Sequence, residues 1–294
     1  MTSTYRISTG EKAYILDGVK QNVREDGRGR FDTCTTRVET GYLLHVHGSA
    51  RWTTLHNGTD VVVSVKASFD TPKHTTPDEG NISCNVTCRE GLPDTLSAAV
   101  LTRRLQRIFS IPEFLKDLCI SESKYCWLLN IDVAIISYNG SALDNIVQAT
   151  HAALNNVKLP KVSVITGDGG LHILDVNDDP TVFTRLNTSV LPVSTSLWLL
   201  GGVPIIDTTT KEEMCSEASI NLSMDRQQSI CGLHMSGTHA VDPKVIKLCI
   251  NAAGNITKGI FDSFNRTLVE EEKGNKRHDI VSEEEAQAAG FNFL

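Results

Sequence analysis

The fold of this chain is decided by a nearly continuous apolar stretch, Trp127-Leu128-Leu129-Asn130-Ile131-Asp132-Val133-Ala134-Ile135-Ile136. Its length and its content of branched side chains predict a long strand at the centre of a sheet. An Asn139-Gly140 turn follows, and residues 142–155 then repeat apolar side chains at helical spacing. The sequence therefore predicts a central strand with a helix directly after it.

Shorter segments before this stretch predict the rest of a sheet. β-Branched residues alternate there with polar ones, and glycines separate the segments, as in an antiparallel sheet with turns. The predicted strands are residues 36–40, 42–47, 60–66 and 82–88, with turns at Gly41, Gly48 and Gly58. The apolar residues 13–16 predict an N-terminal helix or arm, and residues 96–109 predict a helix closed by Pro112.

A second round of similar elements begins near Lys161. Strands are predicted at residues 162–165, 194–200, 218–224 and 230–235. A helix is predicted from Pro243, because proline is favoured in a first helical turn, to about Phe264. Two strand-rich halves, each closed by helices, indicate an α+β fold with internal pseudo-duplication. The residues after Glu270 are mostly charged and are expected to be mobile.

Composition and charge exclude several classes of protein. Hydrophobic residues make up 40% and charged residues 21%, which is typical of a soluble globular protein. No apolar run approaches the roughly 18 residues that span a bilayer. Residues 1–110 carry 14 basic and 12 acidic side chains, whereas residues 111–294 carry 14 and 23. Any contact with nucleic acid would therefore come from a local basic cluster, in the first third of the chain.

Eight cysteines and eight Asn-x-Ser/Thr sequons leave open a secreted, disulfide-linked glycoprotein. Residues 1–6 lack the apolar stretch of a signal peptide, and several sequons fall inside predicted elements, where a glycan cannot sit. The cysteines are therefore interpreted as free thiols.

No metal site is predicted from the cysteines and histidines. Cys84 and Cys88 lack a second pair at zinc-ribbon spacing, and His45 with His47 lacks a third ligand. The glycines of residues 167–170 lack the spacing of a nucleotide-binding loop and predict a hairpin turn.

Short motifs in a fixed order carry a family resemblance from Glu11 to Gly259. They are Glu11–Ile15, Asp26-Gly27-Arg28, Gly48–Arg51 at the end of the second predicted strand, Asp60–Ala67, Asp70–Lys73, Arg107–Phe109, Leu118–Ser121 and Cys126-Trp127. Together they resemble the RNase PH family, and within it the ring subunits of the RNA exosome. The resemblance implies an RNase PH fold, of the ribosomal protein S5 domain 2-like type. Residues 1–30 would form an N-terminal arm, 31–190 the first half, 191–268 the C-terminal half and 269–294 an acidic tail.

The resemblance also implies a function. Its members degrade or thread RNA from the 3′ end, and six RNase PH-like proteins form a ring capped by S1/KH subunits. We expect a non-catalytic structural subunit of the exosome core ring, which supports 3′-to-5′ RNA processing and lines the RNA path. Expected partners are other RNase PH-like subunits, including a homologue of mRNA transport regulator 3, the S1/KH cap subunits and single-stranded RNA. No cofactor or membrane contact is expected, and the expected localisation is nucleus, nucleolus and cytoplasm.

The alternative is a phosphorolytic 3′ exoribonuclease or nucleotidyltransferase. Active members of the family carry a Gly-Thr-Arg loop that grips inorganic phosphate, and Gly140-Ser141-Ala142 matches it here. An arginine suits phosphate because it donates two parallel charge-assisted hydrogen bonds. Alanine at position 142 therefore argues against phosphorolysis.

The resemblance also locates the metal-binding carboxylates of active members. Asp207 and Glu213 match two of them, and Ser219 stands where a third would be aspartate. Magnesium requires strict geometry, so the longer glutamate at position 213 and the missing aspartate at position 219 argue against a working metal site. We interpret Asp207, Glu212 and Glu213 as a turn or helix-start cluster on a solvated face, and we predict neither a catalytic residue nor a metal ligand.

Arg103, Arg104 and Arg107 are the predicted RNA-binding residues. Positions three and four apart are neighbours on a helix, so the three share one face. The resemblance implies that this face lies toward the RNA channel. The alternative is an internal ion pair at Arg107 and solvated side chains at the other two positions.

A second basic group, Arg24, Arg28 and Arg30, surrounds an Asp-Gly turn. We predict that these side chains fix the N-terminal segment to the domain through charge-assisted bonds, with RNA contact as the alternative. Aromatic content is only 6%, so base stacking is not expected to dominate RNA binding.

Overall fold

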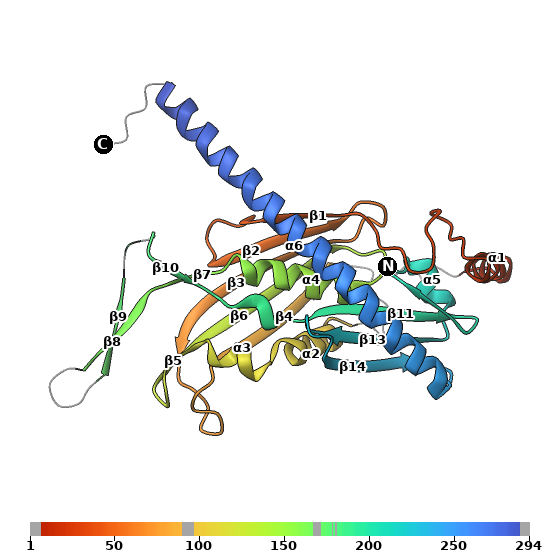
Figure 1. Ribbon diagram of the computed structural model, residues 1–294, viewed down its shortest axis with the longest axis horizontal. Helices are drawn as coiled ribbons and strands as arrows, with labels where there is room; N and C mark the ends of the chain where they lie inside the picture. The colour runs from red at the N-terminus through yellow and green to blue at the C-terminus, as the bar shows by residue number, and fades with distance from the viewer. Residues whose placement is uncertain (1–6, 90–96, 167–171, 178, 180, 289–294) are drawn as a thin grey trace.

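The computed structural model describes residues 7–89, 97–166, 172–177, 179 and 181–288. Its largest sheet has six strands in the order β1-β2-β3-β6-β4, and β5 pairs with β6 (Figure 1). The strands are β1 (Thr36–Thr40), β2 (Gly48–Thr54), β3 (Asp60–Asp70), β4 (Asn81–Cys88), β5 (Cys119–Ser121) and β6 (Tyr125–Ser137).

A second sheet follows later in the chain, with four strands in the order β12-β11-β13-β14. These are β11 (Val193–Leu200), β12 (Val203–Ile206), β13 (Ala218–Met224) and β14 (Ile230–Gly237). Two separate strand pairs lie between the sheets in sequence. They are β7 (Lys158–Pro160) with β10 (Phe183–Arg185), and β8 (Val162–Thr166) with β9 (His172–Val176). The β8–β9 pair extends away from the rest of the molecule (Figure 1).

The helices lie between and around the sheets (Figure 1). They are α1 (Thr9–Lys20), α2 (Ala98–Phe109), α3 (Pro112–Lys116), α4 (Ala142–Asn155), α5 (Thr210–Cys215), α6 (Pro243–Ala288) and the short 3-10 helix η2 (Thr188–Val190). No helix among the described residues is both long and apolar enough to cross a membrane.

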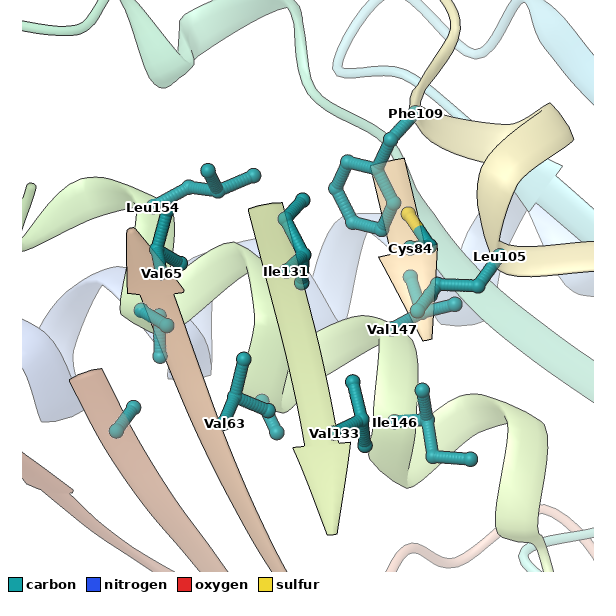
Figure 2. Packing of buried hydrophobic residues seen from close by; sticks show 14 of the residues in the cluster. Val63, Val65, Cys84, Leu105, Phe109, Ile131, Val133, Ile146, Val147 and Leu154 are labelled. Atoms are coloured by element: carbon teal, nitrogen blue, oxygen red, sulfur yellow. The ribbon is translucent and has the colours of Figure 1, made fainter. Parts of the chain in front are cut away.

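The predicted central strand is confirmed as β6. It lies between β3, to which it is antiparallel, and β4, to which it is parallel. Ile131 and Val133 lie on the same face of β6, because successive side chains of a strand point to opposite faces. Both are buried. Figure 2 shows these side chains beside Val63 and Val65 of β3, in the cluster that α4 covers.

Helix α4 is the layer between the two sheets. Its apolar side chains, among them Ile146 and Leu154, pack on the first sheet (Figure 2). At its first turn, Asp144 accepts hydrogen bonds from Ser196 of β11 in the second sheet. The opposite face of β11 packs against α6, where Leu197 belongs to the same buried cluster as Cys249 and Ala253. The first sheet, α4, the second sheet and the first part of α6 therefore follow one another as layers.

Most predicted elements are confirmed. The helix over residues 142–155 and the strands over residues 36–40 and 218–224 have the predicted ends, and the other predicted strands differ by a few residues, apart from the one discussed next. The two strand-rich halves with packed helices confirm the α+β fold. Leu96 and residues 167–170 lie outside the described residues, although β8 and β9 on either side of the latter are antiparallel.

The predicted strand over residues 42–47 is wrong. The chain leaves β1 at Gly41, whose φ is +70°, and the strand that pairs with β1 begins only at Gly48. The intervening residues form a loop that Ser49 closes by accepting from Leu43 N at 2.9 Å. Leu44 in this loop is 90% exposed, so its apolar character does not report a strand. His47 is outside any strand, and its Nδ1 accepts from Ala67 N at 3.1 Å.

Two predicted boundaries are also wrong. Gly48 begins β2 and is not a turn, and the motif Gly48–Arg51 therefore starts the second strand. A Cβ at position 48 would lie 2.5 Å from Val157 Cγ2 and 2.7 Å from Ala153 O, so the glycine permits a close approach of β2 to the end of α4. Pro112 does not close α2, which ends at Phe109, but begins α3.

The last helix is longer than predicted. Helix α6 continues past Phe264 through the charged residues to Ala288, and no proline interrupts it. Phe264 is where it meets the first sheet, with its ring centroid 6.0 Å from that of Trp52.

Candidate functional site

Arg24 fastens the N-terminal arm to the second half of the chain. Its Nε and Nη2 donate to Oε1 and Oε2 of Glu212 at 2.7 and 2.6 Å, which is the bidentate geometry of a guanidinium on a carboxylate. Nη1 and Nη2 also donate to the carbonyls of Ile206 and Asp207 at 3.0 and 2.9 Å. The pair is buried, so the structural interpretation of Arg24 is confirmed.

Arg28 makes the second anchor, and it engages Asp207. Its guanidinium donates to Asp207 Oδ2 at 3.1 Å and to Asp26 Oδ2 at 2.7 Å. The same Asp207 oxygen accepts from Cys34 N, and Asp207 itself has a φ of +45°. Asp207 therefore serves as a docking point for the arm. The side chain of Arg30 makes local contacts, to Asn22 Oδ1 and to the ring of Phe31, and its backbone carbonyl accepts from Ile206 N at 3.0 Å.

The prediction that Glu212 and Glu213 lie on a solvated face is wrong. The prediction that they lie at a helix start is confirmed, because Thr209 and Glu212 form the capping box of α5. Both glutamates are buried. Burial is possible because each carboxylate has partners: Glu212 has Arg24, and Glu213 accepts from Ser141 N at 2.7 Å.

Ala142 lines a cavity of about 170 Å³, referred to below as the Ala142 pocket. It lies where the first turn of α4 meets α2, α5 and the ends of β13 and β14. Its lining is mostly small and polar, and Arg104 is the one cationic side chain among the described residues that line it. The lining residues are Arg104, Ser141, Ala142, Leu143, Ser196, Trp198, Glu213, Ser216, Glu217, Ala218, Ser219, Asn221, Ser236, Gly237 and Thr238.

A protein carboxylate occupies the start of α4 in this pocket. Ser141, the N-cap residue, is left-handed with a φ of +48°, and its N–H donates to Glu213 Oε1. Tyr138 Oη also donates to Glu213, and Thr208 Oγ1 donates at 3.3 Å. A helix N-terminus attracts anions, and Glu213 supplies one from within the chain.

The loop before α4 is held tightly against α5. A Cβ on Gly140 would lie 2.0 Å from Thr208 O, and Gly140 has a φ of +109°, so glycine is required by both space and conformation. Burial raises the pKa of Glu213 to about 7, although the donors Tyr138 and Ser141 lower it. The carboxyl group is therefore partly protonated near neutral pH.

A chain of hydrogen bonds crosses the floor of the Ala142 pocket. Arg104 Nη1 donates to Asn221 Oδ1 at 3.3 Å, and Asn221 Nδ2 donates to Ser196 Oγ at 2.6 Å. Ser196 Oγ and its backbone N–H both donate to Asp144 at 2.8 Å. Burial raises the pKa of Asp144 to about 6. The chain connects a guanidinium at the pocket to a buried carboxyl group behind it.

The three predicted RNA-binding arginines lie differently. Arg104 is half-buried in the pocket, its Nη2 lies 2.5 Å from His234 Nε2, and its Nε has no partner. Arg103 and Arg107 are exposed on α2. Burial lowers the pKa of His234, and the positive charges of Arg104 and Arg107 lower it further. The structure thus brings Arg104 and Arg107 together at His234.

The family's carboxylate positions do not converge on one cavity. Glu213 and Ser219 line the Ala142 pocket, whereas Asp207 lines a different cavity and is engaged by Arg28. In the part of the chain that the structure describes, no group of three or more His, Cys, Asp or Glu side chains could hold a metal ion.

Sequence reasoning missed three residues of this site, Asp144, Asn221 and His234. Asp144 carries a weak signal, since an acidic residue in a first helical turn is common. Asn221 and His234 lie opposite each other on β13 and β14. Only the register of that strand pair brings them to Arg104, and the register is not visible in the local sequence.

Two segments match a known family. Residues 35–160 match domain 1 of the 3′ exoribonuclease family, and residues 191–256 match its domain 2. The family name of both domains is RNase PH.

Curated relatives agree with this match. A Dictyostelium discoideum protein named RRP42 is 26% identical and covers 90% of this chain and 98% of its own length. The exosome complex component Rrp42 of Sulfurisphaera tokodaii is 26% identical over 88% of this chain and 94% of its own. The exosome complex component rrp43 of Schizosaccharomyces pombe is 28% identical over 82% and 90%.

Solved structures share the fold. A chain of an archaeal exosome core superposes with a TM-score of 0.69 at 25% identity and covers 86% of this chain and 96% of its own length. A chain of the Archaeoglobus fulgidus exosome with RNA bound to the active site superposes with a TM-score of 0.71 at 23% identity over 86% and 97%.

Proposed function

Because the chain belongs to the 3′ exoribonuclease family of RNase PH proteins, we propose that it is a ring subunit of an RNA exosome core. The relatives that are named as exosome complex proteins match nearly the whole chain, and the structure shares the fold of chains from exosome cores. In such a ring the subunit builds interfaces and lines the RNA path, and it supports 3′-to-5′ RNA processing.

We propose further that the subunit does not carry out phosphorolysis. The observation that carries this proposal is the carboxylate of Glu213 at the start of α4, beside Ala142. An incoming phosphate would find the backbone N–H of Ser141 already engaged by the Glu213 carboxyl group, with an alanine methyl group in place of a guanidinium fork. A buried acidic group cannot substitute for the missing cation.

The face of α2 is the proposed RNA contact. Arg103 and Arg107 are exposed and can reach phosphates, while Arg104 is held between Asn221 and His234. Arg104 thus has a positioning role, since its guanidinium bridges α2 to the second sheet. The two exposed arginines supply the charge that a single RNA strand would meet.

The identities of the individual partner proteins are also proposals. A homologue of mRNA transport regulator 3 is the proposed neighbour, and S1/KH proteins are the proposed cap. We propose the nucleus, nucleolus and cytoplasm as its localisation, as the family resemblance implies. Affinity purification of the tagged chain at moderate salt, read by mass spectrometry, tests all the protein partners together. Recovery of other RNase PH-like chains with S1/KH proteins in near-equal amounts supports the ring, and recovery of the chain alone contradicts it.

Phosphorolysis is tested on 3′-labelled single-stranded RNA with Mg²⁺ and inorganic phosphate. We expect no phosphate-dependent shortening by the purified chain. A ladder of shortened products that requires phosphate would overturn the non-catalytic assignment. Omission of phosphate is the matched control, because a contaminating hydrolytic nuclease would cut the RNA without it.

The RNA path is tested in the assembled ring. Charge reversal of Arg103 and Arg107 to glutamate should reduce RNA crosslinking and lower the salt slope of binding by about 0.7 per lost phosphate contact. Arg37→Glu is the control, because Arg37 is an exposed arginine on β1 that pairs with Glu39. Equal crosslinking in the α2 variant and the control would show that α2 does not contact RNA.

A further inference from the structure

A second polar cavity lies away from the Ala142 pocket and shares none of its lining residues. Its volume is about 410 Å³, and it lies where the end of α4, the segment from β10 to η2 and the middle of α6 meet. Its walls are formed by His151, Asn155, Arg185, Leu186, Asn187, Thr188, Ser189, Arg226, Phe264, Asn265, Leu268 and Val269. We refer to it below as the Arg226 cavity.

The charge of this cavity is opposite to that of the whole chain. The net charge of the protein is −7, yet Arg185 and Arg226 line the cavity, and no Asp or Glu is found among the described residues that line it. Arg226 is fixed in place because its Nη2 donates to Asn265 Oδ1 at 2.8 Å and its guanidinium lies 5.7 Å from the centre of the Phe261 ring. The cavity thus offers a preorganised cation.

Three carboxamides in the wall are oriented as donors. Asn155 Oδ1 accepts from Thr188 Oγ1, Asn187 Oδ1 accepts from Ser189, and Asn265 Oδ1 accepts from Arg226. Each oxygen accepts a hydrogen bond from the protein, so Nδ2 is the group that each carboxamide can offer as a donor. Guanidinium and amide N–H groups together are donors that suit an anion with several oxygens.

His151 adds an unpartnered polar atom at the back of the cavity. Its side chain is buried, and its Nδ1 has no hydrogen-bond partner. Its ring is 4.8 Å from that of Phe264, which also lines the cavity. Burial lowers the pKa of His151 to about 4, so the imidazole is neutral and can accept a hydrogen bond from a protonated ligand oxygen.

One feature of the cavity opposes an anion. Asn155 is the last residue of α4, and the C-terminal end of a helix carries a partial negative charge of about half an elementary charge. The full positive charge of the Arg226 guanidinium outweighs this partial charge. An anion is therefore favoured overall, most strongly beside Arg226 and at a distance from the end of α4.

We propose that the Arg226 cavity binds a small organic phosphate, with the phosphate group at Arg226 and the organic part against Phe264 and Leu268. The volume exceeds that of a phosphate ion, and apolar side chains line one side of it. A mononucleotide has this combination of a doubly charged phosphate and a flat apolar surface. The site is independent of the RNA path on α2.

The test uses the purified full chain and equilibrium binding of radiolabelled inorganic phosphate, AMP and adenosine. We expect saturable binding of AMP, weaker binding of phosphate and no binding of adenosine. Arg226→Gln should weaken AMP binding about tenfold or more, because it removes a charge-assisted contact. Arg266→Gln is the matched control, since Arg266 is an exposed arginine on α6 that does not line the cavity.

Four results would overturn the proposal. The first is no saturable binding of AMP by the wild-type chain. The second is equal binding of AMP by Arg226→Gln and the control, with both variants shown by circular dichroism to be folded. The third is loss of binding in Arg104→Gln alone, which would assign the nucleotide to the Ala142 pocket. Adenosine that binds as tightly as AMP would equally exclude a phosphate site.

Discussion

Replacement of Arg24 by methionine should cost the protein about 3 kcal/mol of stability. The side chain of Arg24 is fully buried and that of Glu212 is 6% exposed, so neither charge has water as a substitute partner. Breaking a buried ion pair by removing one partner costs about 3–5 kcal/mol, because the other charge stays buried and uncompensated. Glu212 still accepts from Thr209 N at 2.7 Å and from Thr209 Oγ1, which places the expected cost at the lower end of this range.

The measurement is urea unfolding at pH 7, followed by tryptophan fluorescence, with the free energy taken from the linear extrapolation. A double-mutant cycle isolates the pair: Arg24→Met, Glu212→Met and both together. The double variant should cost less than the sum of the single variants, by about 1.5 kcal/mol or more. The matched control is Lys20→Met, which breaks an exposed pair with Asp17 and should cost less than about 0.5 kcal/mol. A cost below about 1 kcal/mol for Arg24→Met, or strict additivity in the cycle, would refute the reasoning.

Three further predictions concern stability. Gly48→Ala should destabilise by about 1–3 kcal/mol in urea unfolding, because its Cβ would overlap the end of α4, whereas Gly10→Ala, with open space around it, should be neutral or stabilising. Leu154→Ala should lower the free energy of unfolding by about 2–5 kcal/mol, and with it the urea midpoint, since this side chain is fully buried between α4 and the first sheet. A urea midpoint within error of the wild type would contradict the packing. Glu213→Gln should change how the stability of the protein depends on pH. The pKa of the Glu213 carboxyl group in the folded state is raised from 4.5 to about 7. The wild type should therefore lose about 3 kcal/mol of stability relative to the variant as pH rises from 4.5 to 7. Parallel urea midpoints of the two proteins from pH 4.5 to 7.5 would show that Glu213 is not perturbed.

Local patterns were sufficient for elements that are buried along most of their length. The strand around Ile131 and the helix that follows it were predicted because burial imposes a period that the sequence shows directly. The loop over residues 42–47 was misjudged for the opposite reason. Its residues are strand formers by type, but pairing of β1 with residues 50–54 leaves them no partner strand.

The site was predictable only where charge dictates a partner. A guanidinium at position 24 cannot be buried alone, so an anchoring role for Arg24 followed from its type and its turn. The burial of Glu212 and Glu213 was not predictable, since acidic residues at a helix start are usually solvated. Their partners Arg24 and Tyr138 are distant in the sequence, and only the assembled fold brings them together.

The position of α4 between two sheets has a consequence for the order in which the chain folds during synthesis. All strands of the first sheet precede α4 in the sequence, so this half of the chain can fold before β11 is synthesised. Before β11 packs on α4, the Asp144 carboxyl group is exposed to water and its pKa is that of an ordinary aspartate. Docking of Ser196 then removes that water and gives the carboxyl group two protein donors. The raised pKa of Asp144 is therefore a property of the assembled two-sheet structure, because burial is its main cause.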